Sequence, residues 1–158
     1  MIGITVVELS SDLFVLDKRV ALGRDAIDLV AILARMGLGD LPAFRRELGL
    51  EDNALIGLGV DRIDYTKGIE ERFLAVERLL EDHPALIGRF TFVQLGAPSR
   101  MVIQHYRQLN ESVATLATRI NARFGKGSYK PIVFGRAHHE PATIFRYYRA
   151  ANFCYVSS

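Results

Sequence analysis

The sequence predicts an α/β fold in which a parallel sheet is flanked by helices. Short, nearly continuous apolar segments alternate with longer segments whose apolar residues recur every three or four positions. The first pattern is typical of strands buried on both faces, and the second of amphipathic helices. Strand–helix–strand units close with right-handed crossovers, so the alternation favours one parallel sheet with helices on its faces.

The regular part of this pattern begins at residue 54. Four strands are predicted, at 54–60, 90–95, 132–134 and 153–156. Three helices are predicted between them, at about 69–82, 102–124 and 141–150. In the first helix Ile69, Phe73 and Val76 share an apolar face, and Glu77 is assigned to the opposite, polar face. In the second helix the apolar stripe is expected to begin at Val102.

The N-terminal part of the chain is less regular. It contains a candidate strand at 4–9, an amphipathic helix within 24–36 and a short helix at 43–48. We therefore divide the chain into two parts. Residues 1–50 form a partly helical segment of unclear origin, and residues 51–158 form the α/β unit.

Composition narrows the classes of function. The chain has 158 residues, with 20 Lys and Arg against 18 Asp and Glu, giving a net charge of +2. This balance does not provide the broad basic face that nucleic-acid binding usually needs, so any anion site must be local. No apolar run approaches the roughly 18 residues of a membrane span, and the N-terminus lacks the pattern of a signal peptide. No membrane or nucleic-acid partner is expected.

The single cysteine, Cys154, has no partner for an internal disulfide and lies in a predicted buried strand. A free cysteine in that setting behaves as a small hydrophobic residue, so we assign Cys154 to the core. The lack of a disulfide or of cysteine pairs with zinc spacing favours a reducing, cytoplasmic location.

The segment 59–68, G-V-D-R-I-D-Y-T-K-G, is the strongest local feature. It places Arg62 and Lys67 in the predicted loop between a parallel strand and a helix whose first N–H groups are free. A guanidinium fork and a mobile ammonium group suit a diphosphate. The alternative is that both cations pair with nearby acids on a solvated surface. Asp61 and Asp64 are expected to cap the following helix or to orient Arg62.

Other residues attract attention but favour structural roles. His138, His139 and Glu140 lack a further ligand at a useful spacing, so no metal site is predicted. Tyr147 and Tyr148 are interpreted as one face of an amphipathic helix, because no basic and aromatic pattern recurs elsewhere.

The segment around Arg62 also resembles the signature of the trehalose-6-phosphate synthase family of retaining glycosyltransferases. Further similar stretches follow in the same order, and together they cover about residues 42–158. They are F-V-Q-L-G-A-P-S-R (92–100), Tyr106, R-I-N (119–121), R-F-G (123–125), P-I (131–132) and A-N-F-C (151–154).

The resemblance implies a B-type glycosyltransferase with two Rossmann-like domains, of which this chain would form part of the second. The implied reaction of trehalose biosynthesis transfers glucose from UDP-glucose to glucose 6-phosphate, giving trehalose 6-phosphate and UDP, with no metal or other cofactor. Arg62 and Lys67 match the pair that holds the donor diphosphate. Arg100 matches an arginine that contacts the acceptor phosphate. His139 falls where some members place an aromatic residue beside the donor base.

The resemblance also leads us to expect a partial chain. The family's acceptor domain, with the residues around the reacting sugar, is not matched before residue 42, so no catalytic residue is assigned. The stretch that would contact the donor ribose would follow Ser158. We therefore expect a fragment with weak or no activity by itself, and an unpaired sheet edge that favours a homo-oligomer. The alternatives are a non-catalytic nucleotide- or phosphate-binding remnant, or a related glucosylglycerol-phosphate synthase.

Overall fold

The computed structural model describes residues 4–8, 41–47, 50, 54–98 and 102–157. Its centre is a five-stranded sheet with the strand order β1-β5-β2-β3-β4. The strands are β1 (Ile4–Glu8), β2 (Leu55–Ile63), β3 (Phe90–Pro98), β4 (Ile132–Gly135) and β5 (Phe153–Ser157). The last four are parallel, and β1 pairs with β5 in the antiparallel direction. The predicted Rossmann-like parallel sheet is confirmed, with β1 added along the outer side of β5.

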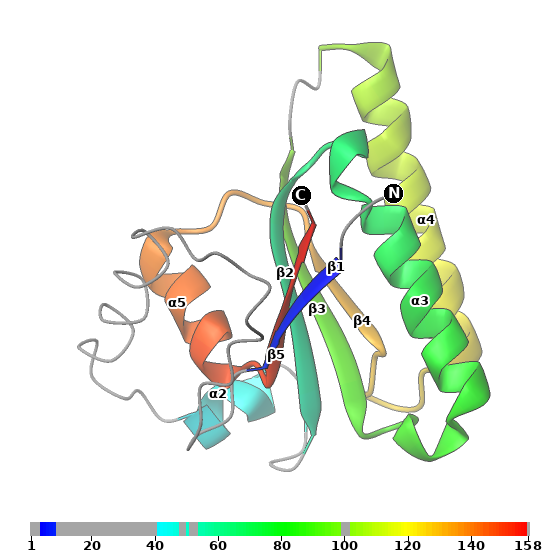
Figure 1. Cartoon of the computed structure of the whole chain (residues 1–158), viewed down its shortest axis with the longest axis vertical. Helices are drawn as coiled ribbons and strands as arrows, with labels where there is room; N and C mark the ends of the chain where they lie inside the picture. Colours follow the sequence, from blue (N-terminus) through cyan, green and yellow to red (C-terminus); the bar gives the residue numbers. More distant parts are fainter. Residues whose placement is uncertain (1–3, 9–40, 48–49, 51–53, 99–101, 158) are drawn as a thin grey trace.

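Helices cover both faces of the sheet (Figure 1). They are α2 (Leu41–Glu47), α3 (Ile69–Asp82), α4 (Gln104–Phe124) and α5 (Pro141–Ala150), with short 3-10 turns η1 (Tyr65–Lys67) and η2 (Pro84–Leu86). In Figure 1, α3 and α4 lie together on one face, and α5 and α2 lie on the other. The helices predicted at 69–82 and 141–150 are confirmed to the residue. The helix predicted within 24–36 lies outside the described residues.

Each face of the sheet has its own apolar core. Under α3 and α4, the buried ring of Phe73 meets Phe92 and Phe134 edge-on, with ring centroids 6.4 and 5.5 Å apart. The core on the α5 side contains Ile56, Leu58, Val93, Leu95, Ala150 and Cys154. Because the central strands are buried on both faces, their sequences are apolar without alternation.

Two predicted boundaries, the end of β2 and the start of α4, are wrong. β2 continues three residues past the predicted end and includes Asp61 and Arg62, so Arg62 lies in a strand and not in a loop. Asp61 and Arg62 extend the strand because pairing with β3 uses backbone N–H and C=O groups and does not depend on apolar side chains. Val102 is 95% exposed, and α4 begins only at Gln104, so Val102 does not belong to the apolar stripe.

Two asparagines within the motif stretches hold strand ends in place. The side-chain amide of Asn121, in α4, donates to the carbonyl of Ile132, and its oxygen accepts from the Ile132 N–H. The side-chain oxygen of Asn152 accepts from the N–H of Ile56, while its own backbone N–H donates to the Ile56 carbonyl. These motif positions therefore serve the architecture of the sheet.

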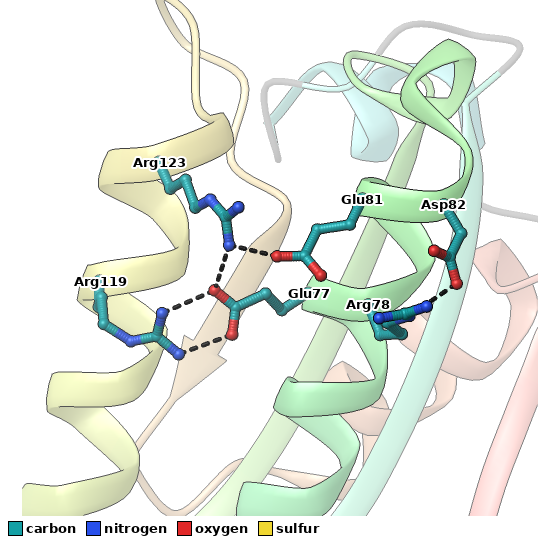
Figure 2. A network of polar contacts seen from close by, with 6 residues as sticks. All are labelled: Glu77, Arg78, Glu81, Asp82, Arg119 and Arg123. Carbon is teal, nitrogen blue, oxygen red and sulfur yellow. Dashed lines mark hydrogen bonds and ion pairs between the residues drawn. The ribbon is translucent and has the colours of Figure 1, made fainter.

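The prediction that Glu77 lies on the polar face of its helix is wrong, because Glu77 is buried between α3 and α4. Its carboxylate accepts two hydrogen bonds of 2.6 Å from Arg119 and one of 3.0 Å from Arg123, which also pairs with Glu81 (Figure 2). The hydrogen bonding from Arg119 is the main cause that lowers the pKa of Glu77 below its ordinary value, against the opposing effect of burial. The network joins the two helices by charge.

We expect Glu77→Gln to lower the urea midpoint of unfolding at pH 7 by a few tenths molar, because a neutral amide binds two guanidinium groups less strongly. The pKa of Glu77 is lower in the folded chain than in the unfolded one. Its stabilising contribution is therefore complete above the unfolded pKa of about 4.3 and is lost as the pH falls through the folded value. Urea titrations from pH 7 to pH 3 should show the difference shrinking in acid. A constant difference would contradict this account.

Candidate functional site

The carboxyl ends of β2, β3 and β4 lie along one edge of the sheet, at the upper end of the view in Figure 1. Open parallel sheets bind ligands at this edge. Arg62 lies at the end of β2, Lys67 closes η1, and His139 follows β4. The fold thus brings three of the four predicted site residues to the same edge. Arg100 lies outside the described residues.

A tight turn connects β2 to α3 and carries Lys67. The carboxylate of Asp64 accepts from the backbone N–H and the hydroxyl of Thr66, both at 3.0 Å, so Asp64 caps the short turn η1 and not the helix α3, which has no side-chain cap. Gly68 follows with a φ of +58°, in the left-handed region that other residues rarely adopt. This glycine ends η1 and begins α3 immediately after Lys67. The turn therefore fixes the backbone position from which the Lys67 side chain extends.

The two predicted cations differ in their surroundings. The side chain of Arg62 is exposed, and within the described part of the chain it makes no ion pair. The ammonium nitrogen of Lys67 lies 4.0 Å from Oδ1 of Asp61, and its side chain is 32% exposed. Pairing with a nearby acid, the alternative reading of both cations, therefore describes Lys67 but not Arg62. Both side chains remain accessible to an anion from solvent.

Asp61 neither caps the helix nor orients Arg62. Its Oδ2 lies 2.7 Å from Nη2 of Arg72, a guanidinium that comes from α3 and is 1% exposed. Nη1 of Arg72 donates to Oε1 of Gln94 at 2.9 Å, and the guanidinium carbon lies 4.7 Å from the centre of the Tyr155 ring. One buried cation thus contacts side chains of β2, β3 and β5.

Sequence reasoning missed Arg72, although a signal was present. Arg72 follows Ile69 by three positions and precedes Val76 by four, so it falls on the apolar stripe of its helix. A charged residue on such a stripe must be buried or must distort the helix packing. A buried charge requires polar or oppositely charged partners. Where those partners lie near the carboxyl ends of parallel strands, they indicate a candidate ligand site.

His139 lies in the loop between β4 and α5. Its ring meets the ring of Tyr147 edge-on, with centroids 6.5 Å apart. Its Nε2 is buried without a hydrogen-bond partner among the described residues and lies against Gly135, where a Cβ would come within 2.9 Å of it. The histidine is thus held between a helix and the end of β4, at the edge where Arg62 lies.

A hollow of about 360 Å³ opens at the same edge, beside α4. It is lined by Pro98, Arg107, Asn110, Glu111 and Arg136. Of the predicted site residues that the structure describes, Arg62, Lys67 and His139, none lines it. Its two arginines, from α4 and from the end of β4, add positive charge at this end of the molecule that the motifs did not indicate.

Within the described ranges, no group of three or more histidine, cysteine, aspartate or glutamate side chains is placed to hold a metal ion. Among the helices of the same ranges, none has the length and apolar character needed to cross a membrane.

Cys154 lies in the core, as predicted, packed between the sheet and α5. Burial raises the pKa of the Cys154 thiol to about 12. Tyr148 of α5 is half-buried in the same region, and burial, with the nearby Cys154 and Asp61, raises its pKa to about 12. The tyrosine pair therefore packs as one face of a helix, in agreement with the sequence.

The parallel sheet with helices on both faces defines a Rossmann-like α/β protein of the kind found in glycosyltransferases. Residues 26–158 match glycosyltransferase family 20, and the chain belongs to this family. The match begins nearer the N-terminus than the motifs do.

Curated relatives and solved structures agree with this assignment. The chain is 33% identical over 145 residues to an α,α-trehalose-phosphate synthase (UDP-forming) of Aspergillus niger, covering 90% of this chain and 30% of the relative. It is 39% identical over 101 residues to the enzyme of Pichia angusta, covering 64% of this chain and 21% of that one. The chain therefore spans between a fifth and a third of the length of these relatives.

Two solved structures overlay on most of the chain. One is an α,α-trehalose-phosphate synthase from Burkholderia xenovorans in complex with glucose-6-phosphate, with a TM-score of 0.69 and 31% identity, covering 78% of this chain and 27% of that one. The other is the Escherichia coli protein bound with UDP-2-fluoro glucose, with a TM-score of 0.68 and 30% identity over 78% of this chain and 27% of that one.

We expect iodoacetamide to modify Cys154 at least about a hundredfold more slowly in the folded chain than in urea. The thiolate is the reactive form, and at pH 8 a thiol with a pKa of about 12 remains protonated. Mass spectrometry of samples quenched over time measures both rates. Rapid, complete labelling in native buffer would show that the residue is accessible and does not belong to the core.

Proposed function

We propose that this chain is the donor-binding part of an enzyme that transfers glucose from UDP-glucose to glucose 6-phosphate, forming trehalose 6-phosphate and UDP. One observation carries the proposal. In a chain of glycosyltransferase family 20, the segment 59–68 presents Arg62 and Lys67 at the carboxyl end of β2. The ligands of the two overlaid relatives, glucose-6-phosphate and UDP-2-fluoro glucose, belong to the same classes of molecule.

The proposed role of the cations follows from the chemistry of the donor. Transfer breaks the bond between C1 of glucose and the β-phosphate oxygen, which leaves with the electron pair. Negative charge therefore grows on the diphosphate, and fixed positive groups that face it lower the barrier. Arg62 offers a planar fork for two phosphate oxygens, and Lys67 offers a mobile point charge. The first N–H groups of α3, which begins directly after Gly68, add partial positive charge.

In the proposed arrangement the rest of the nucleotide lies along the carboxyl edge of the sheet. β2 and β4 are separated by β3, so their ends lie about 10 Å apart. A diphosphate held near Arg62 leaves the base directed toward the end of β4, where we place His139 as the candidate contact. Arg100, which follows β3 in the sequence, is assigned to the acceptor phosphate. A facing domain would be needed to exclude water and to hold the acceptor.

We expect Arg62→Ala and Lys67→Ala each to weaken UDP binding by about tenfold, because each removes a charge-assisted contact to phosphate. Matched controls are Arg89→Ala and Lys126→Ala, which remove exposed cations away from the carboxyl edge and should leave the affinity unchanged. Isothermal titration calorimetry with UDP measures all five proteins. Equal UDP affinity in the unmodified chain and in both site variants would exclude the proposed diphosphate site.

Turnover separates the proposed reaction from its alternatives. UDP release from UDP-glucose that depends on glucose 6-phosphate would support the synthase, and release that depends instead on glycerol 3-phosphate would favour the related glucosylglycerol-phosphate synthase. UDP binding without release under either condition would favour a binding function alone.

Where turnover is measurable, Arg100→Ala should raise the KM for the acceptor several-fold and leave the KM for UDP-glucose unchanged. A change in the donor KM alone would refute the role of Arg100.

A further inference from the structure

Arg72 is a buried charge that contacts Asp61, the strand residue next to Arg62. It comes from the first turns of α3 and is 1% exposed. Gly59 leaves the space for its guanidinium, since a Cβ at that position would lie 2.8 Å from Nη1 of Arg72. A buried charge is costly unless hydrogen bonds and an opposite charge compensate for it. Arg72 has both, through Gln94 and Asp61.

Asp61 connects this buried charge to the exposed lysine. Its Oδ2 lies 2.7 Å from Nη2 of Arg72, and its Oδ1 lies 4.0 Å from the ammonium nitrogen of Lys67. The carboxylate is therefore shared, and the closer partner is the arginine. A change in the charge of Asp61 would therefore act on Lys67.

Arg72 and Asp61 carry opposite charges 2.7 Å apart, so as a pair they add no net charge beside Lys67. Without Arg72 the net charge there would fall by one, and the carboxylate would have lost its nearest partner. It would then bind Lys67 more strongly and compete with a phosphate for the ammonium group.

We propose that Arg72 is a positioning residue that neutralises Asp61 and thereby keeps the charge of Lys67 available for the diphosphate of a nucleotide ligand. The inference rests on the proposed function and adds a residue outside its motif. Because the side chain of Arg72 is 1% exposed, it would act through Asp61 and not by direct contact with the ligand.

A purely structural role for Arg72 makes different predictions from this electrostatic one. If Arg72 only fills space and holds α3, then removing Asp61 as well should leave binding as weak as before, or weaker. If Arg72 neutralises Asp61, then removing both charges restores the original net charge, and binding should recover. Asp61→Asn alone raises the net charge by one and should bind phosphate at least as tightly as the unmodified chain.

The experiment measures the affinity of the full chain for UDP, for inorganic pyrophosphate and for uridine by calorimetry at low salt. Arg72→Met should weaken the binding of UDP and pyrophosphate by at least about threefold, and the Asp61→Asn/Arg72→Met double variant should return to within about twofold of the unmodified chain. Uridine, which has no phosphate, should be unaffected. The matched control is Arg78→Gln, which removes an exposed, ion-paired arginine of the same helix and should change nothing.

Folding is checked by urea unfolding of each variant. If Arg72→Met does not fold, the comparison of Asp61→Asn with the unmodified chain decides, because weaker phosphate binding in Asp61→Asn would overturn the inference. A folded Arg72→Met with unchanged UDP affinity, or a double variant that binds no better than Arg72→Met, would overturn it too. If the unmodified chain binds neither UDP nor pyrophosphate, the proposed function fails and this inference fails with it.

Discussion

The parallel pairing of β2 with β3 is the constraint on which the candidate site depends. The two strands run in register from Leu55 with Phe90 to Ile63 with Pro98. Parallel neighbours must be joined by a crossover, and α3 provides it on the face that it shares with α4. Each helix therefore carries the chain back to the amino end of the sheet, and each parallel strand then ends at the same carboxyl edge. Residues from distant parts of the sequence follow the strand ends there and come to share one surface.

The helix that makes this crossover is fixed on two sides by charged residues. Arg72 joins α3 to three strands through Asp61, Gln94 and the ring of Tyr155. Glu77, five residues later, joins the same helix to α4 through two arginines. Apolar packing can tolerate small shifts of a helix along a sheet, but hydrogen-bonded charges require particular geometry. The start of α3, and with it Lys67, is therefore held more closely than apolar contacts alone would hold it.

Hydrophobic periodicity predicts the helices well, but it fails at Arg72 and Glu77, which are charged and buried. α3 and α5 were predicted to the residue because their apolar faces repeat cleanly. Glu77 was placed on the wrong face because its charge outweighed its position on the stripe, and Arg72 was overlooked for the same reason. The end of β2 was placed too early because Asp61 and Arg62 do not resemble buried strand residues, although backbone pairing continues through them. The site edge could be predicted from motif order, but the contacts of Asp61 depend on the approach of α3, which no local pattern encodes.

The charge at the strand end has a consequence for the proposed reaction. The diphosphate of a nucleotide sugar carries two negative charges, and in the proposed complex it would face Arg62, Lys67 and the first N–H groups of α3. When the sugar departs, the nucleotide gains further negative charge on its terminal oxygen. Because this charge grows as the bond breaks, the N–H groups at the start of α3 would interact with it more strongly in the transition state than in the bound donor. A group that binds more strongly as the bond breaks is one that accelerates the reaction. In the proposed reaction the turn at Gly68, from which α3 begins, would therefore act together with the cations.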